Sequence, residues 1–191
     1  MSQDVAGQVV RRVEEVGPSV AIALEFPMSQ YFDVLRGLVD LTQQKDLKCI
    51  YITAAVPSTT ILATFEALEI NTENIAFVDC ISQMIMGERQ KTEKIIYVES
   101  PTILENIVLK VEFLMRKMGP GQRLVVVDSI NSLAIHNDTK MLSEFLHVLI
   151  SGLSPKEAYP VMLSTAEGMK PDVKEMLNLV CDQVINLQHP D

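Results

Sequence analysis

The chain has 191 residues, of which 48% are hydrophobic and 21% are charged; this composition excludes a disordered chain and can fill a large core. Sixteen lysines and arginines against 25 aspartates and glutamates give a formal net charge of −9, so general nucleic-acid binding, which needs a basic face, is not expected. Uninterrupted apolar runs such as 20–24 and 124–127 are far shorter than the ~18–20 residues of a membrane span, so no membrane association is expected.

The cysteines and the first residues indicate the compartment and the first element. Three cysteines with no CxxC pair favour reduced thiols and a cytoplasmic location. Charges between residues 11 and 15 interrupt any signal-peptide core. Valines at helical spacing instead predict a helix over 4–16, which Gly17 and Pro18 end.

Beyond that helix, continuously apolar segments alternate with segments of helical period. The expected strands cover residues 19–25, 48–53, 75–79, 94–98, 123–127, 159–164 and 181–187. The expected helices cover residues 30–44, 59–70, 101–118, 138–152 and 172–179. This alternation predicts an α/β fold of three α/β/α layers with a mostly parallel central sheet. We expect a single domain over 1–191, with an N-terminal helix in 1–17 and an α/β core in 18–191.

Capping residues indicate where several helices start. Ser29 before the 30–44 helix and Asp138 before the 138–152 helix are expected N-caps. Ser100 followed by Pro101 predicts a capped helix with proline at its first position.

The segment Met84–Lys94 shows neither the period of a helix nor the continuous apolar run of a buried strand. It combines charged residues with apolar anchors, which makes it the candidate interaction loop, although methionines are also typical of core packing.

Ligands of parallel α/β sheets bind beyond the carboxyl ends of the strands, so residues at the strand exits are the candidates for chemistry. Asp128 ends an apolar strand in a Walker B pattern, in which the carboxylate holds the water shell of a nucleotide-bound Mg²⁺. Many strands also end in an aspartate that only caps its loop. A third interpretation joins Asp79 and Asp128 in one divalent-metal site, but no nucleophile with an adjacent base accompanies them.

The segment 124–135, LVVVDSINSLAI, resembles the Walker B region of the RecA superfamily, in particular its KaiC-like and RadA-like branch, where a serine follows the aspartate. The segments that resemble other strands of that branch, in the same order, are 49–53, 75–80, 160–165 and 181–187. The resemblance covers nearly the whole chain and implies a RecA-like P-loop NTPase fold. It also implies ATP with Mg²⁺ as ligands and assembly into rings or filaments.

The expected phosphate loop departs from that family. A Walker A loop, GxxxxGK[ST], wraps phosphates with glycine backbone N–H groups and reaches them with its lysine. The matching turn here, 25–31 (EFPMSQY), has neither residue, and Gln30 and Tyr31 stand approximately where the lysine and hydroxyl ligand would be. Glu25 opens the turn, where we expect it near the helix N-terminus and repelling phosphate. The residues of this degenerate nucleotide site are Pro27, Met28, Ser29, Gln30, Tyr31, Asp128 and Ser129.

A second departure lies after strand 48–53, where KaiC-like ATPases carry an acidic pair and this chain has Ala54 and Ala55. Without lysine or base, the sequence favours a pseudo-ATPase with no catalytic residues and no required cofactor. Its partner would be a second copy or a related active RecA-like ATPase, for which it acts as scaffold or regulatory subunit. The alternative is a nucleotide-binding protein or weak ATPase, with phosphate on the N–H groups of 28–31 and Mg²⁺ on Asp128.

Overall fold

The computed structural model describes residues 4–87 and 92–187, and within them seven strands form one sheet in the order β4-β3-β2-β5-β6-β1-β7. The strands are β1 Ile22–Phe26, β2 Lys48–Thr53, β3 Ile75–Asp79, β4 Ile95–Tyr97, β5 Arg123–Asp128, β6 Tyr159–Thr165 and β7 Gln183–Asn186. Every pairing between them is parallel. The expected parallel α/β sheet is therefore confirmed.

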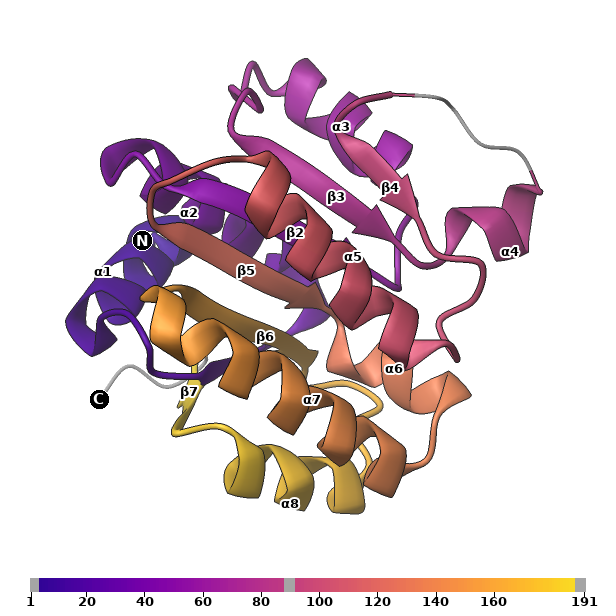
Figure 1. Ribbon diagram of the computed structural model, residues 1–191. Coiled ribbons are helices and arrows are strands. Elements are labelled where there is room, and N and C mark those ends of the chain that lie inside the picture. The colour runs from indigo at the N-terminus through magenta and orange to yellow at the C-terminus, as the bar shows by residue number, and fades with distance from the viewer. Residues whose placement is uncertain (1–3, 88–91, 188–191) are drawn as a thin grey trace.

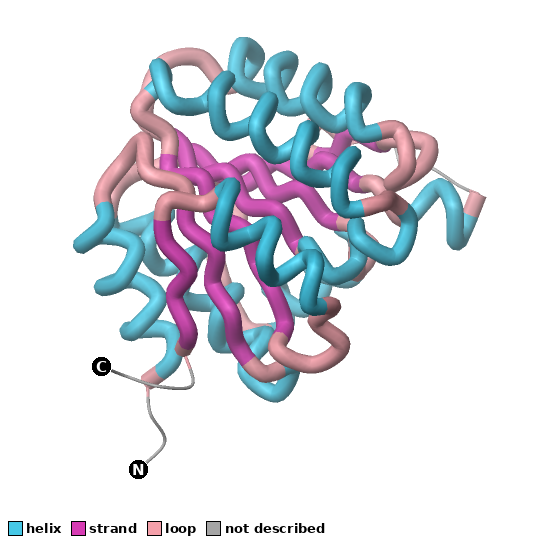
Figure 2. Tube along the Cα trace, turned by 90° about the horizontal axis from the view of Figure 1, so that it is seen from below, coloured by secondary structure: helices cyan, strands magenta, loops and turns pink. Residues whose placement is uncertain are grey.

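Helices cover both faces of this sheet (Figures 1 and 2). The helices are α1 Val5–Val16, α2 Tyr31–Gln44, α3 Ser58–Ala67, α4 Ser82–Met86, α5 Leu104–Lys117, α6 Ile130–His136, α7 Thr139–Leu153 and α8 Pro171–Val180, and the 3-10 turns are η1 Met28–Gln30 and η2 Ser154–Lys156. One apolar core lies between the sheet and α1, α2 and α3, and a second lies between the sheet and α5, α6, α7 and α8. The three-layer architecture follows from these two cores. Among the described residues, no helix is both long and apolar enough to span a bilayer.

Side chains of each strand alternate between the two cores. On β1, Ile22, Leu24 and Phe26 face α1 and α2, whereas Ala23, together with Ala21 just before the strand, faces the other helices. Because both faces are covered, the strand is apolar at almost every position. The same reason explains why the bounds of β2 and β3 agree with the sequence prediction.

Two expected helix starts are wrong and one is confirmed. Asp138 caps α7, since its carboxylate accepts a hydrogen bond of 2.8 Å from the backbone N–H of Met141. Ser29 is exposed inside η1 and makes no capping bond; α2 begins at Tyr31 after this turn. Ser100 bonds Thr102 within a turn instead of capping a helix at Pro101, and α5 begins at Leu104.

The Met84–Lys94 segment begins within helix α4. Met84, Ile85 and Met86 are about half exposed there, so the core interpretation of these two methionines is wrong. Residues 88–91 lie outside the described part of the chain.

A glycine lets α1 and α2 approach closely. A Cβ on Gly37 would lie 2.6 Å from the carbonyl oxygen of Ala6 and 2.8 Å from the Cβ of Val9. Backbone atoms cannot give way as a flexible side chain can, so this position excludes larger residues. Gly152, in α7, has open space at the same position.

We predict that Gly37→Ala lowers the free energy of unfolding by roughly 1–3 kcal/mol through overpacking. The matched control Gly152→Ala should leave it unchanged or raise it by up to about 1 kcal/mol, because alanine favours helix. Urea denaturation measures both, and equal effects of the two substitutions would contradict the close α1–α2 packing.

Candidate functional site

The carboxyl ends of β1, β2, β5 and β6 meet at one edge of the sheet, where α2 begins. β5 lies between β2 and β6, and β6 lies beside β1. This arrangement brings Asp128, the last residue of β5, to the start of α2 although 97 positions separate it from Tyr31. The predicted site residues at 27–31 and at Asp128 are therefore neighbours in space.

Two tyrosines donate hydrogen bonds to the carboxylate of Asp128. The hydroxyl groups of Tyr31 and Tyr51 both donate to its Oδ2 atom, the second at 2.5 Å. Tyr31 is the first residue of α2, and Tyr51 lies on β2. The side chain of Asp128 is buried, and its Oδ1 atom has no hydrogen-bond partner among the described residues.

Burial dominates the protonation of this cluster. It raises the pKa of Asp128, and the two hydrogen bonds from the tyrosines only partly oppose that rise. Burial also raises the pKa of Tyr31 and of Tyr51, and the nearby charge of Asp128 adds to both shifts. Both phenols therefore stay protonated at neutral pH and serve as donors to the carboxyl group.

The turn before α2 is closed by contacts within the chain. The backbone N–H of Met28 donates to Oε2 of Glu167 at 2.9 Å, and the N–H of Gln30 donates to the carbonyl of Pro27 at 2.9 Å. Ser29 is exposed, and the Oε1 atom of Gln30 is buried with no partner among the described residues. A carboxylate thus lies where a phosphate would meet this backbone N–H.

Ser129 caps the helix that follows β5. Its hydroxyl accepts a hydrogen bond of 3.2 Å from the N–H of Ser132 and so caps α6, and the Asp128–Ser129 peptide bond is cis. Asn131, on the same helix, exchanges hydrogen bonds of 3.0 and 2.8 Å with the backbone of Thr165. These contacts fasten α6 to the end of β6.

Asp79 is fully engaged by hydrogen bonds from the starts of α3 and α4. Its carboxylate accepts hydrogen bonds from the backbone and hydroxyl of Ser58, the backbone and hydroxyl of Ser82, and the backbone of Ile81. Two strand spacings, about 9–10 Å, separate Asp79 from Asp128, since each pairs with Thr53 in the register. The described residues hold no group of three potential metal ligands, and Asp79 is best explained as a loop cap.

Glu25 does not lie at the start of α2, which corrects the sequence expectation. Strand alternation places it on the opposite face from Phe26, toward α8. There its Oε1 atom accepts a hydrogen bond of 3.1 Å from Asn186 and lies 3.8 Å from Nζ of Lys174. Glu167, from the loop after β6, takes the place expected of Glu25 beside the turn.

Sequence reasoning missed the roles of Tyr51 and Glu167. Tyr51 continues an apolar strand pattern, so it is indistinguishable from a core residue until the β2–β5 pairing is known. Ala54, which the structure places beside Asp128 through a backbone hydrogen bond of 2.7 Å, has no side chain that could polarise a water.

The three cysteines lack nucleophilic character. All are buried and free, and burial raises the pKa of Cys49 and of Cys181 to about 12. Burial raises the pKa of Cys80 as well. They pack as small apolar side chains.

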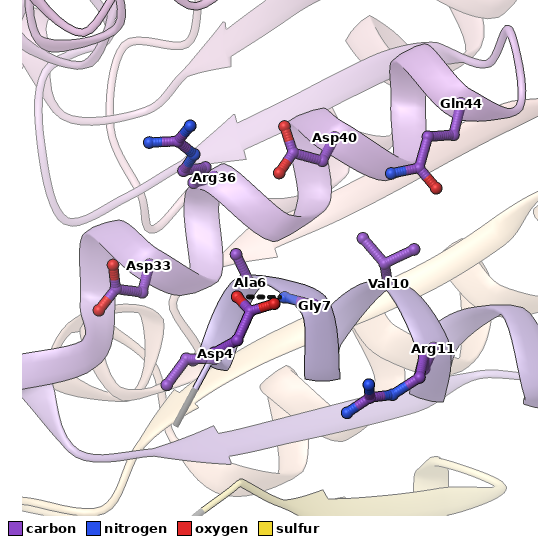
Figure 3. Close-up of a pocket in the computed structure, with 10 residues that line it drawn as sticks. Asp4, Ala6, Gly7, Val10, Arg11, Asp33, Arg36, Asp40 and Gln44 are labelled. Atoms are coloured by element: carbon purple, nitrogen blue, oxygen red, sulfur yellow. Dashed lines mark hydrogen bonds between the residues drawn. The ribbon is translucent and has the colours of Figure 1, made fainter. Parts of the chain in front are cut away.

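A separate polar hollow of about 570 Å³ lies between α1 and α2 (Figure 3). Arg11 and Arg36 line it together with Asp4, Asp33 and Asp40. Charges of both signs are therefore interspersed along its lining.

Two solved structures have a similar fold. The structure resembles the KaiC-like protein PH0186 from the hyperthermophilic archaeon Pyrococcus horikoshii OT3 with a TM-score of 0.62 at 13% identity, over 91% of this chain and 75% of that chain. It resembles the flagellar accessory protein FlaH from Methanocaldococcus jannaschii with a TM-score of 0.59 at 12% identity, over 97% of this chain and 77% of that chain.

No curated protein sequence matches the chain significantly. The family model "ATPase: KaiC" matches residues 37–190, a range that starts inside α2 and omits the 27–31 turn. With its RecA-like fold and a match over most of its length, this chain belongs to the KaiC ATPase family.

Proposed function

We propose that this chain is a non-catalytic member of the KaiC family, a pseudo-ATPase that acts as a scaffold or regulatory subunit by associating with itself or with an active ATPase. The observation that carries this proposal is the pair of tyrosine hydroxyls on Asp128. In a working Walker B site that carboxylate faces the water shell of Mg²⁺. Here the carboxylate faces two phenolic hydroxyl groups instead of that water shell.

The residues around Asp128 do not fit a nucleotide-bound Mg²⁺. The carboxylate is 1% exposed, and Tyr31 stands where the family's small hydroxyl ligand would be. The Oδ2 atom is held by Tyr31 and Tyr51 and the Oδ1 atom is itself buried, so a hydrated cation would reach Asp128 only if the surrounding side chains moved. Mg²⁺ gives up its waters reluctantly, so a closed setting is unfavourable for it.

The turn at 27–31 does not fit phosphates either. It lacks the lysine and glycines of a Walker A loop, and the N–H of Met28 is already bound to the carboxylate of Glu167. An incoming phosphate would meet a negative charge there. With Ala54 and Ala55 after β2, no side chain at that exit can act as a base. These features support loss of both nucleotide affinity and hydrolysis.

We predict that MgATP or MgADP at millimolar excess leaves the thermal midpoint of the protein unchanged. A ligand at about 100 times its dissociation constant adds about 2.7 kcal/mol, which raises the midpoint of a domain this size by roughly 5–10 °C. Scanning fluorimetry measures the midpoint with Mg²⁺ and nucleotide and, as the reference, with Mg²⁺ alone. A rise of that size would favour the alternative of an unconventional nucleotide site.

Self-association or pairing is tested separately by light scattering after gel filtration. We expect a mass above that of one chain, or co-elution with an active KaiC-family ATPase of the same organism. A monomer at all concentrations that forms no such complex would contradict the scaffold role, whatever the result with nucleotide.

The protonation of Asp128 gives a pH prediction. Because burial raises the pKa of Asp128 in the folded state, the folded protein holds this proton more tightly than the unfolded chain, and the group's contribution to stability falls as pH rises from about 3.9 through the raised value. Asp128→Asn removes this titration. Its free energy of unfolding relative to the wild type should therefore increase from about pH 4 to neutral pH.

Urea denaturation at several pH values measures that difference. The matched control Glu175→Gln removes an exposed carboxylate from the middle of α8 and measures the effect of removing one surface charge. A difference that is constant or decreases with pH would show that folding does not raise the pKa of Asp128, which would contradict the dominance of burial at this carboxyl group.

A further inference from the structure

Helices α5 and α7 lie side by side on the face of the sheet opposite α1 and α2 (Figure 1). A groove of about 420 Å³ separates their outer surfaces. Its lining is apolar apart from two glutamates: Leu104, Val108 and Leu109 come from α5, and Met141, Phe145 and Val148 come from α7. Helices already cover both faces of the sheet. No segment of the described chain lies over this groove.

The groove continues along the helix pair. A smaller hollow shares Val108 and Val148 with it and extends to Met115 and Gly152. The two helices have 14 and 15 residues, or about 21–22 Å at 1.5 Å per residue. The combined groove thus suits an elongated occupant lying along the helices.

Large apolar side chains are exposed beside the groove. Leu109 and Val148, which line it, are each 58% exposed, and Met141, which also lines it, is 48% exposed. Contiguous apolar surface that is hollowed and has a polar rim is typical of interaction sites. Ile135 and Leu179 are also exposed but line neither hollow.

The rim of the groove is acidic. Glu105 and Glu144 line its main part and Glu112 lines the continuation, where Lys156 is the one basic residue. Within the described part of the chain, none of these glutamates forms an ion pair. An occupant therefore needs an apolar surface for the floor and positive charges for the rim.

We propose that the α5–α7 groove binds an amphipathic α-helix of a partner protein, whose apolar stripe is flanked by lysines or arginines. Apolar residues at i, i+3, i+4 and i+7 would lie on Val108, Phe145 and Val148, as in other complexes where a helix occupies a groove. The basic residues pair with Glu105 and Glu144. This surface lies on different helices from the Asp128 site, so the proposal does not depend on whether nucleotide binds.

The probe is a fluorescent designed peptide of about 15 residues with leucines at i, i+3, i+4, i+7, i+8 and i+11 and lysines beside them. Fluorescence anisotropy with the full chain should give saturable binding with a dissociation constant of about 1–100 µM. A peptide of equal composition in scrambled order should bind at least about tenfold more weakly, because it has the charge without the apolar stripe.

Variants locate the binding. The double substitution Leu109→Ser and Val148→Ser should weaken binding about tenfold or more, whereas Leu179→Ser, at an even more exposed position on α8, should not change it. Glu105→Gln with Glu144→Gln should weaken binding and flatten its salt dependence. All of these positions are exposed, and thermal midpoints verify that the variants are folded.

The proposal is overturned by no saturable binding up to about 500 µM, by equal binding of the scrambled peptide, or by equal loss with Leu179→Ser. Scrambled-peptide binding would mean attraction to the acidic chain in general. The nucleotide experiments above involve other residues, so either proposal can fail alone.

Discussion

Two phenolic hydroxyl groups on one buried carboxylate join the elements that meet at the carboxyl edge of this sheet. A buried carboxylate costs free energy unless hydrogen bonds satisfy it. Tyr31 from α2 and Tyr51 from β2 supply them to Asp128 of β5. Since Tyr31 directly follows η1, the same bonds fix the 28–30 turn, and Glu167 closes it from the β6 side. Four elements are joined where a nucleotide site would need open space.

A nucleotide site and a closed carboxylate make opposite demands on the same residues. Phosphate binding needs free N–H groups and positive charge, whereas this edge offers a bound N–H and a second carboxylate from Glu167. Under the proposed function, these contacts stabilise the closed arrangement and disfavour a bound nucleotide. A separate surface for binding is the α5–α7 groove, where apolar side chains are exposed and no segment of the described chain covers them.

The sequence predicts the fold well because the strongest signals are local. Continuous apolar runs give β2 and β3 their bounds, and Asp138 is a cap because it precedes a helical period with no competing turn. Ser29 fails as a cap because η1 satisfies the neighbouring backbone by itself. The site is only half predictable: Asp128 is recognised by its place at a strand tip, but Tyr51 and Glu167 acquire their roles from strand order and loop packing, which no local pattern encodes.

The most direct test is a crystal structure of the protein grown with millimolar MgADP. We predict that the hydroxyl groups of Tyr31 and Tyr51 both lie within hydrogen-bond distance of Asp128, that Glu167 contacts the N–H of Met28, and that no nucleotide density lies at 27–31. A Tyr31 ring turned away from Asp128, with a metal ion and phosphates in its place, would contradict the account.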